Sequence, residues 1–158
     1  MKWQPEILGA LAALALAAAW PVIAQGADEA TLQPYKARYQ VHYRGLNGGQ
    51  IETGLRPGPE PGQWLYETRP FPSLLGRLAV SSQGRERGVM QVTSAGVRPL
   101  TFDFNDGSDG SVKDVSFAFD WNARRVKGVA EGVPFEFDVP PGTQDTASVQ
   151  AAMLIDLL

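Results

Sequence analysis

The sequence predicts a mainly β fold: a curved antiparallel meander sheet, half-barrel or barrel-like, with one C-terminal helix packed on its aromatic face. Two observations support this prediction. From Tyr35 onwards, short segments of alternating apolar and polar residues are separated by turns rich in Gly, Pro, Asn and Asp. The period then changes, because residues 146–157 are apolar on nearly every side of a helix, and such a helix requires burial.

The first 24 residues are typical of a cleaved export signal. Lys2 provides a positive start, residues 7–19 are apolar, and Ala24 is a small residue at the expected cleavage point. A membrane-anchored helix is the alternative, but the apolar run is short and Pro21 interrupts its end. We expect residues 25–34 to be a tether and residues 35–158 a single β-rich domain. The expected location is the periplasm, with the extracellular space as the alternative.

Composition excludes several classes of function. The formal net charge of −3 and the isoelectric point near 5.1 argue against nucleic acid as a partner, since a basic surface would be expected. The chain has no cysteine, which excludes disulfides, thiol chemistry and lipid attachment through Cys. We expect no cofactor, no metal, and no integral membrane segment after signal cleavage.

The first half of the domain reads as three strands. Residues 35–43 alternate strictly, with Tyr, Ala and Val on one side and mostly charged or polar residues on the other. Residues 45–49 predict a turn, and residues 50–56 a second strand. The Pro- and Gly-rich residues 57–62 form a loop before a third strand at residues 63–69.

The second half continues the meander after one irregular segment. Residues 71–80 are apolar without alternation, which predicts a short helical turn or a flap over the mouth of the sheet. Short turns separate the later strands, so neighbours should be antiparallel, in a meander of about eight strands. The remaining predicted strands are residues 86–94, 97–105, 112–121, 124–129 and 133–139.

One face of this sheet should be rich in aromatic side chains. Because a sheet with a single helix to cover it tends to leave an apolar cavity, we infer a concavity that binds an apolar or amphiphilic ligand. The alternative is a filled interior, in which case the protein is a structural or assembly factor of the cell envelope that acts through protein–protein contacts. The predicted ligand-binding residues are Tyr39, Trp64, Phe102, Phe117, Phe119 and Phe135.

Several motifs resemble a bacterial family called domain of unknown function 3108. They are the Tyr-rich opening strand that ends at a Gly-containing turn, the Arg98-Pro99 start of a strand, the Phe119-Asp120-Trp121 end of the next, and residues 141–145 with Ser148 before the apolar helix. The resemblance covers residues 35–158 and implies a periplasmic, β-rich domain of no established activity. Family members are usually longer, which suggests that this chain is truncated at its C-terminus.

No group of residues indicates catalysis. His42 is the only histidine and lacks the partners that a triad or a metal site needs. The Asn, Asp and Gly residues of segment 105–110 resemble a calcium loop, but a hairpin turn explains them equally well and no Glu completes the ligand set.

Two further polar groups have ordinary explanations. Asp145 is expected to cap the helix rather than to act with Gln144 as an acid or orienting amide. Lys36, Arg38 and Arg44 form a basic stripe that could meet an anionic lipid head group or partner, but a solvated strand edge whose charges discourage aggregation is the better explanation. We therefore predict a protein that is not an enzyme.

Overall fold

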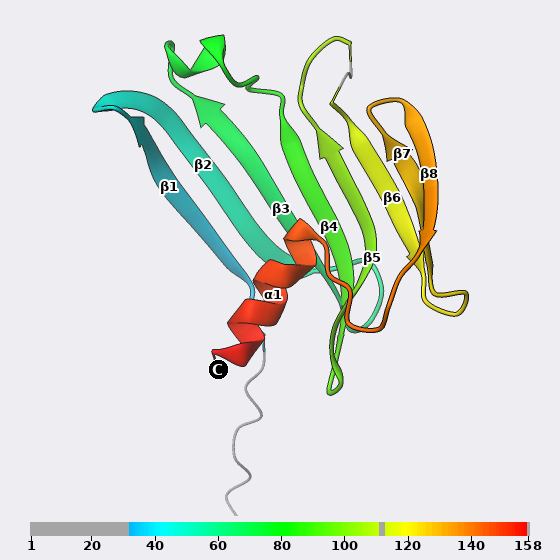
Figure 1. Ribbon diagram of the computed structural model, residues 1–158. Coiled ribbons are helices and arrows are strands. Elements are labelled where there is room, and N and C mark those ends of the chain that lie inside the picture. Colours follow the sequence, from blue (N-terminus) through cyan, green and yellow to red (C-terminus); the bar gives the residue numbers. More distant parts are fainter. Residues whose placement is uncertain (1–31, 111–112, 158) are drawn as a thin grey trace, which may run out of the picture.

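The computed structural model of the chain describes residues 32–110 and 113–157, and these residues form one sheet and one α-helix (Figure 1). The eight strands lie in the sheet in chain order, and each pair of neighbours is antiparallel. The predicted leader and residues 25–31 of the predicted tether lie outside the described residues. The elements are β1 (Tyr35–Tyr43), β2 (Leu46–Pro57), β3 (Gln63–Pro72), the 3-10 helix η1 (Gly76–Leu78), β4 (Arg85–Thr93), β5 (Gly96–Asn105), β6 (Val115–Asp120), β7 (Arg125–Ala130), β8 (Val133–Asp138) and α1 (Thr146–Asp156).

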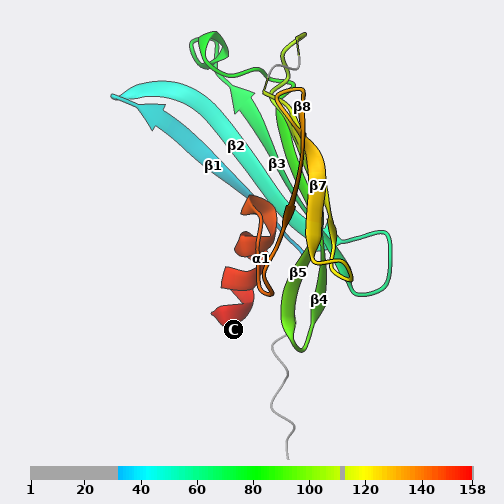
Figure 2. The same ribbon diagram turned by 45° about the vertical axis from the view of Figure 1, so that its right-hand side comes forward.

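The sheet curls towards α1 and does not close (Figures 1 and 2). We call the face that holds α1 the inner face and the opposite one the outer face. The helix packs on β3, β4 and β5, in the middle of the sheet. The predicted fold, a curved antiparallel meander with one C-terminal helix on its aromatic face, is confirmed.

The core lies between α1 and the middle strands. Leu55 and Met90 are almost fully buried there, beneath Ala147 and Ala151 of the helix. Leu32 also belongs to this core, with 6% of its surface exposed. The last residues of the segment predicted as a tether therefore contribute to the folded domain.

The helix begins where it was expected. The Asp145 carboxylate accepts hydrogen bonds from the backbone N–H groups of Ala147 and Ser148, and the Ser148 hydroxyl accepts one from the Asp145 N–H, which completes a capping box. The helix lies on the sheet as predicted and is buried on the side that meets it. Only Ala147, Ser148 and Ala151 are buried, because the sheet covers one side of the helix, and Leu157 is 81% exposed.

The β1–β2 hairpin differs from the predicted turn at residues 45–49. The turn is made by Arg44 and Gly45, whose φ angles are 49° and 81°, as in the two-residue turns that match strand twist. The Asn-Gly-Gly residues that follow belong to β2, and a bulge between Val41 and His42 adjusts the register.

Segment 71–80 contains the expected helical turn, η1. Backbone and side-chain bonds hold it against the β1–β2 hairpin, since the Ser73 N–H donates to the Gly48 carbonyl at 3.0 Å and the Ser73 hydroxyl donates to the Asn47 carbonyl at 2.7 Å. Figures 1 and 2 place the segment at the end of the sheet beside β2, so it does not cover the inner face as a flap.

Candidate functional site

One row of residues crosses the inner face from β1 to β8. Each member is the register partner of the next, so their side chains share one face of the sheet. Gly88 shows which face this is, because a Cβ built on Gly88 would lie 2.3 Å from the Cβ of Ala147 in α1. The row consists of Tyr35, Leu55, Tyr66, Gly88, Phe102, Phe117, Gly128 and Phe135.

Aromatic rings on β5–β8 form a continuous chain of contacts on this face, which we call the aromatic cluster. Phe102 stacks on Phe117 with ring centroids 4.9 Å apart, and Phe117 meets both Phe119 at 5.6 Å and Phe135 at 6.0 Å edge to face. The series of ring contacts then branches, since Phe119 stacks on Trp121 and Phe135 stacks on Phe137. The cluster comprises Phe102, Phe117, Phe119, Trp121, Phe135 and Phe137.

Gly128 brings two of these rings together. It lies between Phe117 and Phe135 in the row, and a Cβ at this position would be 2.4 Å from the Cβ of Phe117. Only glycine permits so close an approach of β6 and β7. The rings of the flanking strands can then meet directly across the space that a side chain at this position would fill.

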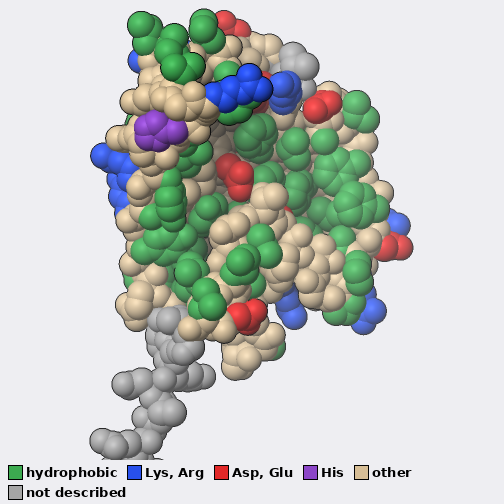
Figure 3. Space-filling model, turned by 60° about the vertical axis from the view of Figure 1, so that its left-hand side comes forward, with side chains coloured by type: hydrophobic (Ala, Val, Ile, Leu, Met, Phe, Trp, Pro, Cys, Tyr) green, Lys and Arg blue, Asp and Glu red, His purple; other side chains and the backbone are tan. Residues whose placement is uncertain are grey.

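The helix covers only one end of the aromatic cluster. Phe102, next to α1, is 8% exposed, whereas Phe137 on the last strand is 55% exposed. Tyr39, on the opposite side of α1, is 57% exposed. In Figure 3 hydrophobic side chains flank a hollow, with an acidic side chain inside it. The inner face is thus an open, largely apolar trough that α1 divides.

All six residues predicted to bind a ligand point to the inner face, but they do not form one group. Phe102, Phe117, Phe119 and Phe135 belong to the aromatic cluster. Trp64 packs against the core beneath α1. Tyr39 lies on β1 and has no ring contact with the cluster. Trp121 and Phe137 join the cluster without having been predicted, although they continue the alternation of their strands.

Polar groups border the trough at the start of α1. Glu86 lies on the inner face two residues before Gly88, and its carboxylate accepts a hydrogen bond from the Thr146 hydroxyl at 3.0 Å. The Oδ2 atom of Asp145 is buried and has no hydrogen-bond partner within the described residues. Burial raises the pKa of Asp145, although its bonds to the helix N–H groups act in the opposite direction. Gln144 donates to the Val97 carbonyl and fixes the approach to the helix.

The outer face is charged and largely paired. Lys36 and Arg38 of the predicted basic stripe both bind Glu52, and their hydrogen bonds lower the pKa of that carboxyl. These two cations share one carboxylate, which offsets part of the positive charge of the stripe. Arg44 lies apart at the hairpin, 5.3 Å above the ring of Tyr43.

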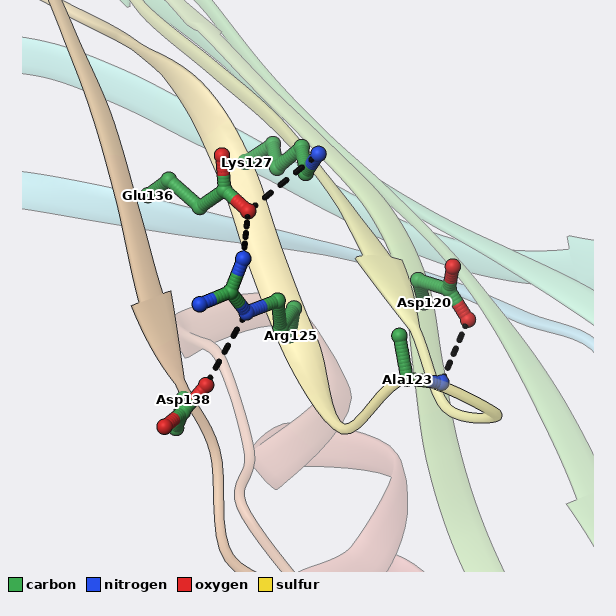
Figure 4. A network of polar contacts seen from close by, with 6 residues as sticks. All are labelled: Asp120, Ala123, Arg125, Lys127, Glu136 and Asp138. Atoms are coloured by element: carbon green, nitrogen blue, oxygen red, sulfur yellow. Dashed lines mark hydrogen bonds and ion pairs between the residues drawn. The ribbon is translucent and has the colours of Figure 1, made fainter.

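A second group of ion pairs joins β7 to β8 (Figure 4). Arg125 contacts Glu136 and, at 3.0 Å, Asp138, while Lys127 also binds Glu136 at 3.2 Å. The hydrogen bond to Asp138 is the main reason that the pKa of Arg125 is raised. The nearby Asp120 carboxylate accepts from the Asn122 and Ala123 N–H groups and shapes the β6–β7 turn. These contacts stabilise the edge of the sheet and do not form a reactive site.

Two depressions on the outer face are also candidates for binding. One, of about 640 Å³, lies over β4–β7 between the side chains of Arg85, Arg87 and Lys127. The other, of about 600 Å³, lies over β1–β3 and is lined by the Lys36 and Glu52 pair. Both are bounded by long charged side chains that stand on the strands.

The groups considered for chemistry at the sequence level remain apart. His42 is exposed on β1, and among the described residues no three His, Cys, Asp or Glu side chains cluster as metal ligands would. In segment 105–110, which resembles a calcium loop, the Asn105 side chain and the Asp106 N–H both donate to the Asp114 carboxylate, and the Ser108 N–H donates to the Asp106 carboxylate. The loop thus uses these oxygens for its own turns.

Comparison with known proteins gives no relative: no family model, no curated protein and no solved structure matches the chain. Across residues 32–110 and 113–157, none of the helices has the length and apolar character needed to span a membrane.

Proposed function

We propose that the domain binds an apolar or amphiphilic ligand on the inner face, over the part of the aromatic cluster that α1 leaves uncovered. One observation supports this proposal above all. The rings form an unbroken contact chain from the buried Phe102 to Phe137, which is 55% exposed. Exposed apolar surface of this extent usually marks a binding site.

The geometry suits a flat or elongated apolar group. Stacked and edge-to-face rings offer broad contact areas at little cost in conformational entropy, because contacts within the cluster already restrain them. Glu86 and Asp145 lie at the start of α1 on the same face. A ligand whose head group donates hydrogen bonds would find acceptors there while its apolar part lies on the rings.

The alternative proposal is a structural or assembly factor of the cell envelope. It is favoured by the edges of the sheet, because among the described residues β1 and β8 each pair with a single strand. An added strand from another protein could satisfy the open backbone groups of such an edge. Export to the periplasm, a non-catalytic role and membership of the family of domain of unknown function 3108 are part of both proposals, and all rest on sequence.

The test is a titration of the full chain with N-phenyl-1-naphthylamine, a flat, uncharged fluorescent probe whose N–H group can donate a hydrogen bond. We expect saturable binding that Phe137→Arg weakens about tenfold, since a charge at the exposed end of the cluster opposes an apolar ligand. Val129→Arg is the matched control, because Val129 is also exposed, at 41%, but lies on the outer face of β7. Equal effects of the two variants, or no binding by the folded wild-type chain, would overturn the inner-face site.

A further inference from the structure

A second exposed apolar surface lies at one end of the sheet. The β1–β2 hairpin and segment 73–80 lie side by side there (Figures 1 and 2). Leu74 and Leu78 are 84% and 87% exposed, which is extreme for leucine. In Figure 3 hydrophobic side chains stand out at the upper end of the molecule. We define the apolar tip by its exposed members: Tyr43, Leu46, Leu74, Leu75, Leu78 and Val80.

The tip is held in a fixed conformation. The N–H of Arg77 donates to the Ser73 carbonyl and that of Val80 to the Gly76 carbonyl, each at 3.0 Å. Gly76 lies so close to the hairpin that a Cβ on it would be 2.1 Å from the Gly48 carbonyl oxygen. Together with the two bonds from Ser73 to the hairpin, these contacts present the leucines on an organised turn. Such pre-ordering lowers the entropic cost of binding.

The charge of this end is opposite to that of the chain as a whole. Residues 39–51 and 69–85 contain arginines but no Asp or Glu, whereas the net charge of the chain is −3. Arg44 forms part of the hairpin turn and Arg77 belongs to η1, so both cations lie among the exposed apolar side chains. Acidic residues meet this end at its boundary. Glu67 contacts Arg69 and Arg85, and the Ser81 hydroxyl donates to the Gly107 carbonyl of segment 105–110.

We propose that the apolar tip docks on an anionic lipid bilayer. The leucines enter the boundary between head groups and acyl chains, while Arg44 and Arg77 contact lipid phosphates. Leucines that project from the end of a molecule beside arginines match such an interface, whereas a protein groove would have to enclose them. This surface is distinct from the inner face, and its role does not depend on a ligand there.

The test uses the cysteine-free chain to place one probe at a time. The full chain with Leu78→Cys carries the polarity-sensitive fluorophore NBD and is mixed with phosphatidylcholine vesicles that contain or lack phosphatidylglycerol. The control is Leu157→Cys with the same probe, because Leu157 is also 81% exposed but lies at the end of α1. A probe on the tip reports immersion of the tip itself, whatever residues 1–24 do.

We expect a blue shift and quenching by spin-labelled lipid at position 78 with anionic vesicles, and neither at position 157. Arg77→Gln should weaken this binding about fivefold, the effect of one cation near a charged bilayer, and Leu74→Gln about tenfold, from lost apolar burial. Phe137→Arg on the inner face should leave it unchanged, which separates this proposal from the proposed ligand site.

Three results would overturn the proposal. They are equal signals from positions 78 and 157, equal binding to neutral and anionic vesicles, and no effect of either tip substitution. If the tip instead joins two copies of the chain, light scattering would detect a dimer. Leu74→Gln would then dissociate this dimer and leave vesicle binding unchanged.

Discussion

Gly88→Ala is expected to destabilise the domain by displacing α1 from the sheet. The added methyl group would lie 2.3 Å from the Ala147 Cβ, well inside the separation of two carbon atoms in contact, about 3.5–4.0 Å. The helix must therefore shift by more than about 1 Å, or Ala147 must leave the core. Overpacking of this kind typically costs about 1–3 kcal/mol, and it acts on α1, which covers the core.

The assay is chemical denaturation followed by tryptophan fluorescence, with Gly54→Ala as the matched control. Gly54 is also a strand glycine, but it lies on the outer face, and its Cβ would meet only the Tyr35 carbonyl, at 3.3 Å. This substitution should change the free energy of unfolding by less than about 0.5 kcal/mol, because it lies away from the core.

A compensating substitution tests the cause directly. Ala147→Gly alone should cost about 1 kcal/mol through lower helix propensity, yet in the Gly88→Ala background it should restore stability because it removes the clashing methyl group. The expected coupling energy is about 1–3 kcal/mol. The proposed packing of α1 on Gly88 would be refuted by either of two results: equal stability of Gly88→Ala and Gly54→Ala, or strictly additive effects of Gly88→Ala and Ala147→Gly in the double variant.

The remaining predictions concern burial and the helix cap. Met90 is 0% exposed, so Met90→Ala should cost about 2–5 kcal/mol of stability. Phe137 lies at the exposed end of the aromatic cluster, and Phe137→Ala should cost about 1 kcal/mol or less. Similar losses of stability for the two variants in thermal unfolding would contradict this difference in burial. Because the folded-state pKa of Asp145 is raised, its charged form is penalised, so stability falls as pH rises through that pKa. Asp145→Asn keeps an acceptor for the helix N–H groups, so its free energy of unfolding should match or exceed that of the wild type at pH 7 and lose this advantage as pH falls. Asp145→Ala should cost about 1 kcal/mol. An Asn variant as unstable as the Ala variant at pH 7 would show that the cap needs the charge.

Local patterns in the sequence were enough to predict the order of the strands. Alternation of period two identified the strand faces, and short Gly, Asn and Asp turns left little choice but antiparallel neighbours. The Asp145 cap and the helix start at Thr146 were equally local, because Asp145 caps through groups within three residues of itself. The same patterns placed all six predicted ligand-binding residues on one face.

Features that depend on distant contacts could not be read in this way. Nothing near Gly88 in the sequence indicates that Ala147 lies above it, so the position of α1 across the sheet was not predictable. The hairpin turn was misplaced because Arg44 adopts a positive φ, which its side chain does not favour. The grouping of the predicted site residues was missed for a related reason: alternation gives the face of a residue but not its distance across eight strands.

The way in which α1 is seated explains why aromatic surface remains open. The helix approaches the sheet through the short side chains of Ala147, Ser148 and Ala151, and Ala147 lies directly against Gly88. Small side chains bring two elements close together, and most contacts of α1 are accordingly with the strands beneath it, β3 to β5. The longer side chain of Met153, which could extend over neighbouring rings, is 56% exposed instead. The features that fix the helix thus leave the rings of β6–β8 uncovered, and a ligand or partner that covers them would add contacts without displacing α1.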